Sequence, residues 1–155
     1  MLTKGDMAPN LRLTVQNGEE FSLVDLKGKI VVLYFYPKAD TPGCTVESCA
    51  FRDHMGTFES AGAVIVGVSP DTEKAQMKFA NKFTLPFKLI ADKDHLLCEA
   101  FGVWVEKSMY GKKYMGVERA TFIIDGEGII QTVFPKVKIE GHIEETLAAV
   151  KSLTN

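Results

Sequence analysis

The run KIVVLYFY at residues 29–36 restricts the possible folds of this chain more than any other feature. Its β-branched and aromatic residues do not alternate with polar ones, which is typical of a central strand covered on both faces. The run stops at Pro37, which has no backbone N–H to offer a neighbouring strand. A strand that must be covered on both faces indicates a sheet with helices packed against its two sides.

Further strands and helices alternate along the chain. Asn17-Gly18, between two apolar alternating runs, predicts an N-terminal hairpin over residues 11–23. Later apolar runs predict strands at 63–69, 87–92, 120–125 and 129–134, the last two forming a hairpin. Helical spacing predicts helices at 41–60, 69–83, 94–102 and 141–153, the second with Ser69 as its cap and Pro70 at its first position. This order predicts an α/β fold with a central mixed β-sheet, helices on both faces and an N-terminal β-hairpin.

The bulk properties narrow the classes of function. A chain of 155 residues predicts a single domain spanning residues 1–155. The formal charge of −2 gives no basic field for a nucleic acid or an anionic membrane, so neither partner is expected. Residues 1–10 lack the pattern of a secretory or transit peptide, and the longest apolar run is too short to cross a bilayer. A cytoplasmic, reducing location is therefore expected, where the three cysteines are thiols rather than structural bridges.

Two of the cysteines lie close together in TPGCTVESC, residues 41–49, just beyond the predicted central strand. Chemistry in α/β sheets tends to occur at this carboxyl edge. Cys44 falls in the first turn of the predicted helix, where the helix dipole favours a thiolate. Lowering a thiol pKa from about 8.5 to about 6 takes about 3.4 kcal/mol, and a helix terminus supplies at most about 2. A cation is therefore needed as well.

The chain has three arginines, of which Arg119 is the best candidate for that cation. It opens a predicted core strand that could pair beside residues 29–36, and its planar fork can hold a sulfur anion and a second acceptor together. Thr41, one helical turn before Cys44, offers a hydroxyl to the sulfur or to a substrate oxygen, or serves as the helix cap.

The spacing of Cys44 and Cys49 has a geometric consequence. On an intact helix their Cα atoms would be about 8–9 Å apart, whereas a disulfide needs at most about 7 Å. The two residues can form a bridge only if the first turns of the helix unwind, and such a bond should be strained and easily reduced. This behaviour suits a catalytic cycle better than a structural bridge.

At this point the sequence resembles a known family. PKADTPGC matches the P-x-x-x-T-x-x-C signature of peroxiredoxins at Pro37, Thr41 and Cys44. The further Cys49, the W-x-x-K of residues 104–107 and GVERATFIID around Arg119 resemble the bacterioferritin comigratory protein/peroxiredoxin Q branch. The resemblance covers nearly the whole chain and implies a thioredoxin-like fold with thiol peroxidase activity.

The resemblance also implies roles for the residues. Cys44 would be the peroxidatic cysteine and Cys49 the resolving cysteine, while Thr41 and Arg119 would activate the sulfur and the peroxide, with Pro37 in the same signature. The implied substrates are hydrogen peroxide and alkyl hydroperoxides, and the implied reductant is thioredoxin or a similar dithiol, in antioxidant defence. No metal or other cofactor is implied. A resolving cysteine in the same chain removes the need for a dimer, which favours a monomer.

Two other functions are compatible with paired cysteines. A thiol–disulfide oxidoreductase acting on proteins would share the fold but usually carries C-x-x-C, and it would reduce insulin. A binding domain with redox-marker or zinc-bound cysteines would need further ligands, and no histidine is spaced to supply them. The peroxidase is the favoured interpretation.

The remaining candidates have structural interpretations. Cys98, among apolar residues at helical spacing, is predicted to be a buried inert thiol. Trp104 is predicted to pack against its own segment. Three scattered histidines are predicted to be solvated at the surface: His54, His95 and His142. Three lysines are predicted to line a solvated face or a hairpin rim, with docking of a reductase as the alternative: Lys107, Lys112 and Lys113.

Overall fold

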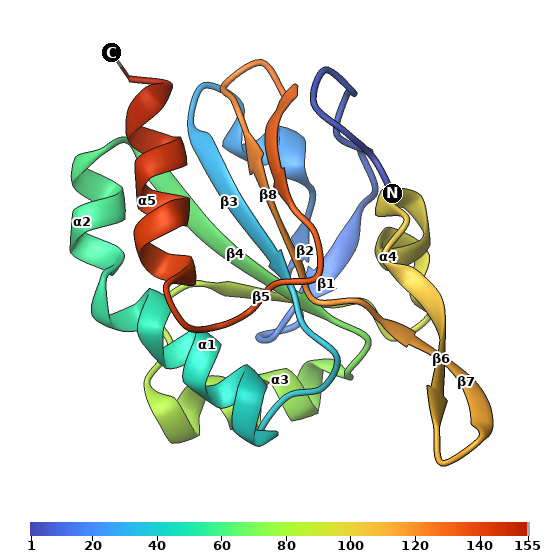
Figure 1. Ribbon diagram of the computed structural model, residues 1–155. Coiled ribbons are helices and arrows are strands. Elements are labelled where there is room, and N and C mark those ends of the chain that lie inside the picture. Colours follow the sequence, from blue (N-terminus) through green and yellow to red (C-terminus); the bar gives the residue numbers. More distant parts are fainter. Residues whose placement is uncertain (155) are drawn as a thin grey trace.

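The predicted central strand is an interior strand of a seven-stranded sheet in the computed structural model, which describes residues 1–154 (Figure 1). The order across the sheet is β2-β1-β5-β4-β3-β8-β9. Its strands are β1 (Leu13–Val15), β2 (Glu20–Phe21), β3 (Ile30–Phe35), β4 (Ala63–Ser69), β5 (Lys88–Ala91), β8 (Ala120–Ile124) and β9 (Ile130–Phe134). Strands β3, β4 and β5 are parallel, while β1, β8 and β9 pair antiparallel with their neighbours, so the sheet is mixed.

The pairing of β3 explains why its residues are continuously apolar. It lies between parallel β4 and antiparallel β8, and its residues from Val31 to Phe35 are buried. The predicted neighbour that follows Arg119 is therefore confirmed as β8. The predicted N-terminal hairpin is also confirmed, with β1 and β2 joined across Asn17-Gly18.

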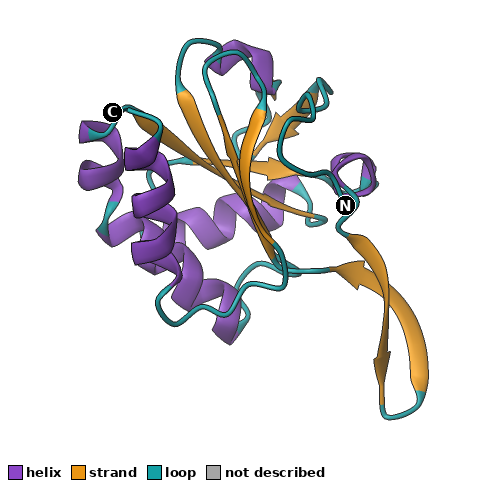
Figure 2. Cartoon of the chain, turned by 45° about the horizontal axis from the view of Figure 1, so that its top comes forward, coloured by secondary structure: helices purple, strands orange, loops and turns teal. Residues whose placement is uncertain are grey.

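Helices cover both faces of the sheet, but unequally (Figure 2). One face packs against α1 (Pro42–Asp53), α2 (Met55–Ser60), α3 (Glu73–Phe83) and α5 (His142–Ser152). The other face packs against the shorter α4 (Leu96–Phe101), the 3₁₀ helix η1 (Leu23–Leu26) and the N-terminal segment. Within the described residues, none of these helices is long and apolar enough to cross a bilayer.

The helix predicted over 41–60 is two helices, because it is interrupted at His54. The imidazole Nδ1 of His54 lies 2.9 Å from the carbonyl oxygen of Ala50, the acceptor that the backbone N–H of residue 54 would use in a continuous helix. A side chain that competes for this carbonyl favours a break. The prediction of one helix was wrong at this point.

The predicted start of the next helix was also wrong. Helix α3 begins at Glu73, and its cap is Thr72, whose Oγ1 accepts a hydrogen bond from the N–H of Ala75 at 3.1 Å. Ser69 instead ends strand β4, where its hydroxyl donates to Asp71 at 2.6 Å. Pro70 and Asp71 thus form a connection beside the loop that follows β3, and this position has a consequence for the site described below.

A two-stranded ribbon is formed by β6 (Trp104–Met109) and β7 (Lys112–Val117), and the sequence indicated it only through the hairpin rim predicted for Lys107, Lys112 and Lys113. It forms a separate sheet and projects from the body of the molecule (Figures 1 and 2). Its strands are mostly exposed, so they lack the apolar alternation that identifies a half-buried strand.

Candidate active site

Cys44 lies at the start of α1, directly beyond the carboxyl end of β3. Thr41 is the N-cap residue and Pro42 opens the helix, a position where the missing N–H of proline costs nothing. The side chain of Cys44 is 1% exposed. Its sulfur is therefore close to the unpaired N–H groups of a helix start and shielded from bulk solvent, so nearby charges act on it with little screening.

Arg119 reaches this sulfur from the residue just before β8. Its Nη2 donates to Cys44 Sγ at 3.2 Å, and its Nη1 donates to Glu47 Oε1 at 2.6 Å. Burial by itself would lower the pKa of Arg119, but the neighbouring negative charges of Glu47 and Cys44 outweigh burial and raise it. The structure therefore brings together the predicted thiol and the predicted cation, with the guanidinium placed to stabilise negative charge on sulfur.

Glu47 is a site residue that sequence reasoning missed. It lies three residues after Cys44 on α1, is 1% exposed, and forms an ion pair with Arg119. Burial raises the pKa of Glu47 to about 7, although the charge and hydrogen bond of Arg119 oppose this shift. Its Oε2 is buried without a hydrogen-bond partner among the described residues. The available signal was a carboxylate one helical turn from a candidate nucleophile, on the same face.

The loop between β3 and α1 is held from the neighbouring connection. The carboxylate of Asp71 accepts hydrogen bonds from the N–H of Ala39 at 2.7 Å and from the hydroxyl of Ser69 at 2.6 Å. An ion pair of 2.9 Å joins Asp40 in this loop to Lys82 on α3. Pro70 and Asp71, predicted as part of a helix start, thus lie in a connection that holds in place the loop leading to Cys44.

Pro37 and Thr41 lie in this loop, but neither makes a hydrogen bond to the sulfur. Pro37 is half-buried and follows directly on the last buried residues of the β3 region. The hydroxyl of Thr41 donates to the carbonyl oxygen of Lys38 at 2.7 Å and makes no side-chain cap bond. Thr41 is thus the N-cap residue by position, while its hydroxyl contacts neither the Cys44 sulfur nor a backbone N–H of the helix.

Cys49 is half-buried and lies in the same continuous helix as Cys44. Both are free thiols, as is Cys98. The middle of α1 is anchored to the sheet beside Cys49, because the Ser48 and Tyr34 hydroxyls are hydrogen-bonded at 2.8 Å. The reduced helix is therefore wound between the two cysteines, the condition in which they cannot bridge.

Other candidate residues lie away from this cluster. Cys98 is fully buried in α4, as predicted, and burial raises the pKa of its thiol. His54 is exposed, as predicted, and His95 is half-buried, with its ring stacked on Trp104 at a centroid distance of 4.1 Å. Among residues 1–154 there is no cluster of three or more histidine, cysteine or acidic side chains that could hold a metal ion.

The prediction that His142 is a surface residue was wrong. It is 1% exposed and lies at the start of α5, where Thr121 of β8 is 2.8 Å from its Nε2 and Glu145 is 2.8 Å from its Nδ1. Burial lowers the pKa of this imidazole. The residue fills a polar position between α5 and the sheet, which charged neighbours in the sequence did not indicate.

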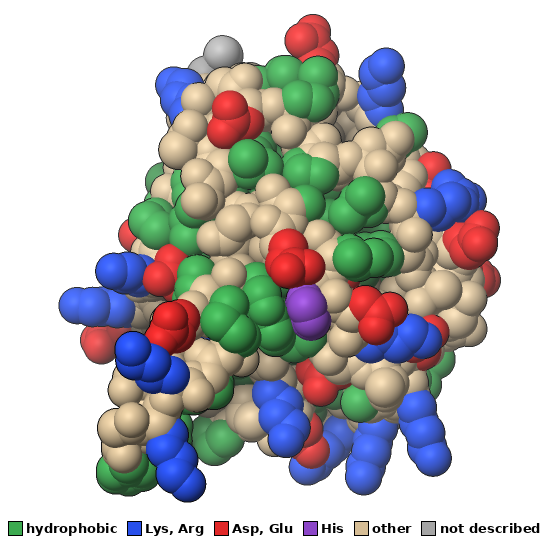
Figure 3. Space-filling model, turned by 90° about the vertical axis from the view of Figure 1, so that its right-hand side faces the viewer, with side chains coloured by type: hydrophobic (Ala, Val, Ile, Leu, Met, Phe, Trp, Pro, Cys, Tyr) green, Lys and Arg blue, Asp and Glu red, His purple; other side chains and the backbone are tan. Residues whose placement is uncertain are grey.

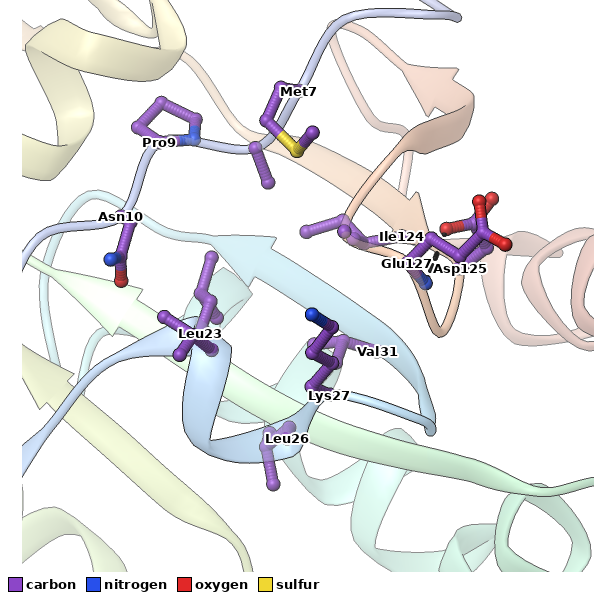
Figure 4. Close-up of a pocket in the computed structure, with 13 residues that line it drawn as sticks. Met7, Pro9, Asn10, Leu23, Leu26, Lys27, Val31, Ile124, Asp125 and Glu127 are labelled. Carbon is purple, nitrogen blue, oxygen red and sulfur yellow. Dashed lines mark hydrogen bonds between the residues drawn. The ribbon is translucent and has the colours of Figure 1, made fainter.

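A cavity of about 250 Å³ lies at the other end of the sheet (Figure 4). It lies beneath the N-terminal segment at Pro9, beside η1 at Leu23 and Leu26, and against Val31 and Ile124 at the opposite end of the β3–β8 pair from the predicted site. None of the predicted site residues lines it.

Comparisons with known proteins agree with this geometry. Residues 4–133 match the AhpC/TSA family. Peroxiredoxin Bcp of Bacillus subtilis is 49% identical over 150 residues, which cover 97% of this chain and 96% of that protein. A putative peroxiredoxin bcp of Coxiella burnetii is 53% identical over 143 residues, covering 92% of this chain and 95% of the other.

Solved structures give the same result. A crystal structure of a Xylella fastidiosa PrxQ mutant matches with a TM-score of 0.94 and 35% identity, covering 100% of this chain and 99% of that one. Xanthomonas campestris peroxiredoxin Q matches with a TM-score of 0.89 and 42% identity, covering 94% and 92%.

The chain belongs to the AhpC/TSA family, in the Bcp/peroxiredoxin Q branch of the peroxiredoxins. The predicted resemblance is confirmed, and so is the thioredoxin-like α/β fold with its mixed sheet and N-terminal hairpin. As a member of this branch, the chain is a thiol-dependent peroxidase that acts on peroxides and receives electrons from a thioredoxin-type reductant.

Proposed function

We propose that this peroxidase reduces hydrogen peroxide and alkyl hydroperoxides at Cys44. The contact of 3.2 Å between Arg119 Nη2 and Cys44 Sγ, at the start of a helix, is the observation that carries this assignment. Arg119 supplies the positive charge that is needed because a helix terminus alone does not stabilise a thiolate sufficiently. A Xanthomonas campestris relative, 41% identical with a TM-score of 0.89, has been studied for alkyl peroxide reduction with a trapped intermediate/ligand complex.

In the first step the Cys44 thiolate attacks one peroxide oxygen. A sulfur–oxygen bond forms as the oxygen–oxygen bond breaks, the sulfur is oxidised to a sulfenic acid, and the leaving oxygen departs with a proton as water or an alcohol. Arg119 is placed to hold the peroxide and the developing charge, with the backbone N–H groups at the helix start as further donors. Thr41 and Pro37 complete the pocket, the Thr41 hydroxyl after it leaves the Lys38 carbonyl.

In the second step Cys49 resolves the sulfenic acid. Its thiol attacks the oxidised sulfur, a disulfide forms, and the sulfenic oxygen leaves as water. Because both residues lie in α1, the first turns of this helix must unwind before the sulfurs meet. Thioredoxin or a similar dithiol then reduces the bridge by thiol–disulfide exchange, and the redox chemistry is carried by sulfur throughout without a metal or organic cofactor.

The setting of this activity completes the proposal. The predicted site combines residues of α1 and the loop before it with Arg119, which directly precedes β8. Because these segments are far apart in the sequence, the chain acts as one domain of residues 1–155. A resolving cysteine within the chain lets a monomer complete the cycle. Reduction by a cellular dithiol suits a cytoplasmic location, where the enzyme would serve antioxidant defence.

Thiol chemistry tests the assignment directly. Fully reduced protein is treated with one equivalent of hydrogen peroxide, free thiols are counted, and disulfides are mapped by mass spectrometry. We expect rapid loss of two thiols and a Cys44–Cys49 bridge. Cys49→Ser should accumulate a trappable sulfenic acid, and Cys44→Ser should not react.

Two results would contradict the proposal. The first is a reaction with peroxide no faster than that of free cysteine. The second is oxidation of Cys98 in place of Cys44. Cys98→Ser serves as the control and should retain the full rate.

A further inference from the structure

The β6–β7 ribbon is placed to contact anything that approaches the reactive thiol. Its second strand ends at Val117, and the chain continues within two residues to Arg119, which contacts Cys44. Each strand has six residues, a length of about 20 Å. Figures 1 and 2 both show the β6–β7 ribbon extending outward from the body of the molecule rather than packing on it. Its tip would therefore reach the side of a small protein positioned over the start of α1.

The tip of the ribbon carries a tyrosine that local structure does not favour. Tyr110 is 99% exposed and has a φ of 52°, and Gly111 follows with a φ of 78°. A two-residue turn with both φ angles positive is best formed by Asn-Gly, since a bulky residue is strained in the left-handed region. The chain holds a fully exposed aromatic ring here at a conformational cost, and such local strain is typical of functional positions.

The surface around Tyr110 combines apolar and basic side chains. Met109 and Tyr114 are 56% and 44% exposed. The register pairs Met109 with Lys112 and Lys107 with Tyr114, so these four side chains lie on one face of the ribbon. We call these four residues and Tyr110 the ribbon face. Figure 3, viewed from the side where the ribbon projects, shows hydrophobic and charged side chains interspersed. Exposed aromatic and methionine side chains beside cations are typical of protein interaction sites.

The basic character of the ribbon face continues inward to the reactive site. Lys107 is half-buried, and its Cδ and Cε lie 3.4 Å and 3.6 Å from where a Cβ of Gly116 would be. The missing side chain at Gly116 therefore lets Lys107 lie across β7. Burial lowers the pKa of Lys107, as does the nearby charge of Arg119, which is consistent with a side chain directed toward the site.

We propose that the ribbon face docks the dithiol protein that reduces the Cys44–Cys49 bridge, with Tyr110 as its apolar anchor and Lys112 facing acidic groups of the partner. In the docked complex one partner thiolate attacks the bridge, forming a mixed disulfide and releasing one thiolate of this chain. The second partner thiol then displaces the other sulfur, so the partner is oxidised and both cysteines return to thiols. This inference rests on the proposed function.

Charge favours this occupant over a second copy of the chain. A symmetric dimer through the ribbon face would place the same patch against itself. Lys107 and Lys112 of one copy would then face the lysines of the other, with mutual repulsion. An acidic partner avoids this repulsion and gains from steering by the lysines.

The kinetics of reduction by thioredoxin test the proposal. Steady-state rates are measured with purified thioredoxin and its reductase, and separately with dithiothreitol, which needs no docking surface. Tyr110→Asn and Lys112→Glu should each lower kcat/KM for thioredoxin about tenfold or more while the rate with dithiothreitol changes less than twofold. Tyr110→Asn forms the favoured Asn-Gly turn, so its melting temperature should be equal or higher, which separates docking from folding.

A matched control and the opposing outcomes complete the experiment. Lys29→Glu makes the same charge change at the far end of the sheet and should leave both rates unchanged. Unchanged thioredoxin kinetics in both ribbon variants, or an equal loss with dithiothreitol, would overturn the docking proposal. So would a dimer in sedimentation that Tyr110→Asn dissociates. If wild-type protein consumes no peroxide with either reductant, the proposed function itself fails.

Discussion

At the scale of single residues, the site depends on one guanidinium that contacts two acidic groups of α1. Arg119 reaches Cys44 Sγ with one nitrogen and Glu47 Oε1 with the other, so its position is fixed by a fork of two hydrogen bonds. Small changes beside this fork should therefore alter reactivity without altering the fold. The glycine preceding Cys44 offers one such change.

Gly43→Ala should reduce reactivity while preserving stability. A Cβ at this position would lie 3.3 Å from Arg119 Nη2, a close contact that requires the guanidinium to shift slightly away from Cys44. Alanine favours a helix interior over glycine by about 1 kcal/mol and the first turn by less, which offsets the close contact, so the free energy of unfolding should stay near that of the wild type. We expect the second-order rate constant with hydrogen peroxide, measured by stopped flow, to drop about tenfold. Gly56→Ala in α2, where a Cβ meets nothing within 4 Å, is the control, and equal rates in both variants would contradict the argument.

The raised pKa of Glu47 predicts that this residue stabilises the folded protein less as pH rises. Its pKa is raised from 4.5 to about 7 in the folded protein, so between these values the unfolded chain binds fewer protons. Stability contributed by this group is full below the unfolded pKa and falls as pH rises toward 7. Glu47→Gln removes the effect. Its free energy of unfolding relative to wild type should therefore increase from pH 5 to pH 8, as measured by urea denaturation.

The exposed Glu144 on α5 provides the comparison for that experiment. Glu144→Gln makes the same change at an exposed position and serves as the reference variant. A difference for Glu47→Gln that matches the reference at every pH would show that the buried carboxylate does not titrate in this range.

At the scale of elements, α1 must be stable when reduced yet unwind when oxidised. Its middle is attached to β3 through the hydroxyls of Ser48 and Tyr34, both fully buried. Ser48→Ala should cost about 1–3 kcal/mol of unfolding free energy, because it leaves the Tyr34 hydroxyl buried without its partner. Tyr34→Phe added to that variant should recover most of the loss, as measured by urea denaturation. Additive losses in the double variant would mean that the hydroxyl pair is not coupled.

The elements differ in how well the sequence could predict them. Strand β3 and its alternation with helices follow from burial, because a covered strand must be continuously apolar. The break at His54 depends on a side chain competing for one carbonyl, and helical periodicity carries no sign of it. The β6–β7 ribbon is exposed on both faces, so its residues lack the pattern that burial imposes.

At the scale of the whole molecule, the sequence could predict the site residues that the order of strands brings together. It could not predict those that are brought together by side-chain packing. Cys44 follows a central strand, and Arg119 precedes the strand paired beside it, so topology alone brings them together. Glu47 and His142 are buried titratable groups, and each has a partner from a distant element: Arg119 for Glu47 and Thr121 for His142. Their burial is a property of the assembled fold, which the sequence next to each residue does not indicate.

The catalytic cycle predicts that oxidation lowers the stability of the whole protein. A bridge between Cys44 and Cys49 closes a short loop, and that cross-link alone contributes about 2 kcal/mol. Forming it removes the Arg119–sulfur hydrogen bond, a charge-assisted interaction of about 1.5–3 kcal/mol, together with the first turns of α1 and the burial of Cys44. We expect the peroxide-oxidised protein to melt several degrees below the reduced protein, with faster amide exchange in the first half of α1.

Cys49→Ser treated in parallel separates bridge formation from oxidation of Cys44 itself, and it should not show the faster exchange. An oxidised form that melts at or above the temperature of the reduced form would contradict the prediction. If the prediction holds, the folded reduced state is the more stable one. The free energy lost on oxidation then favours reduction of the bridge, so the fold itself drives electron transfer from the dithiol partner.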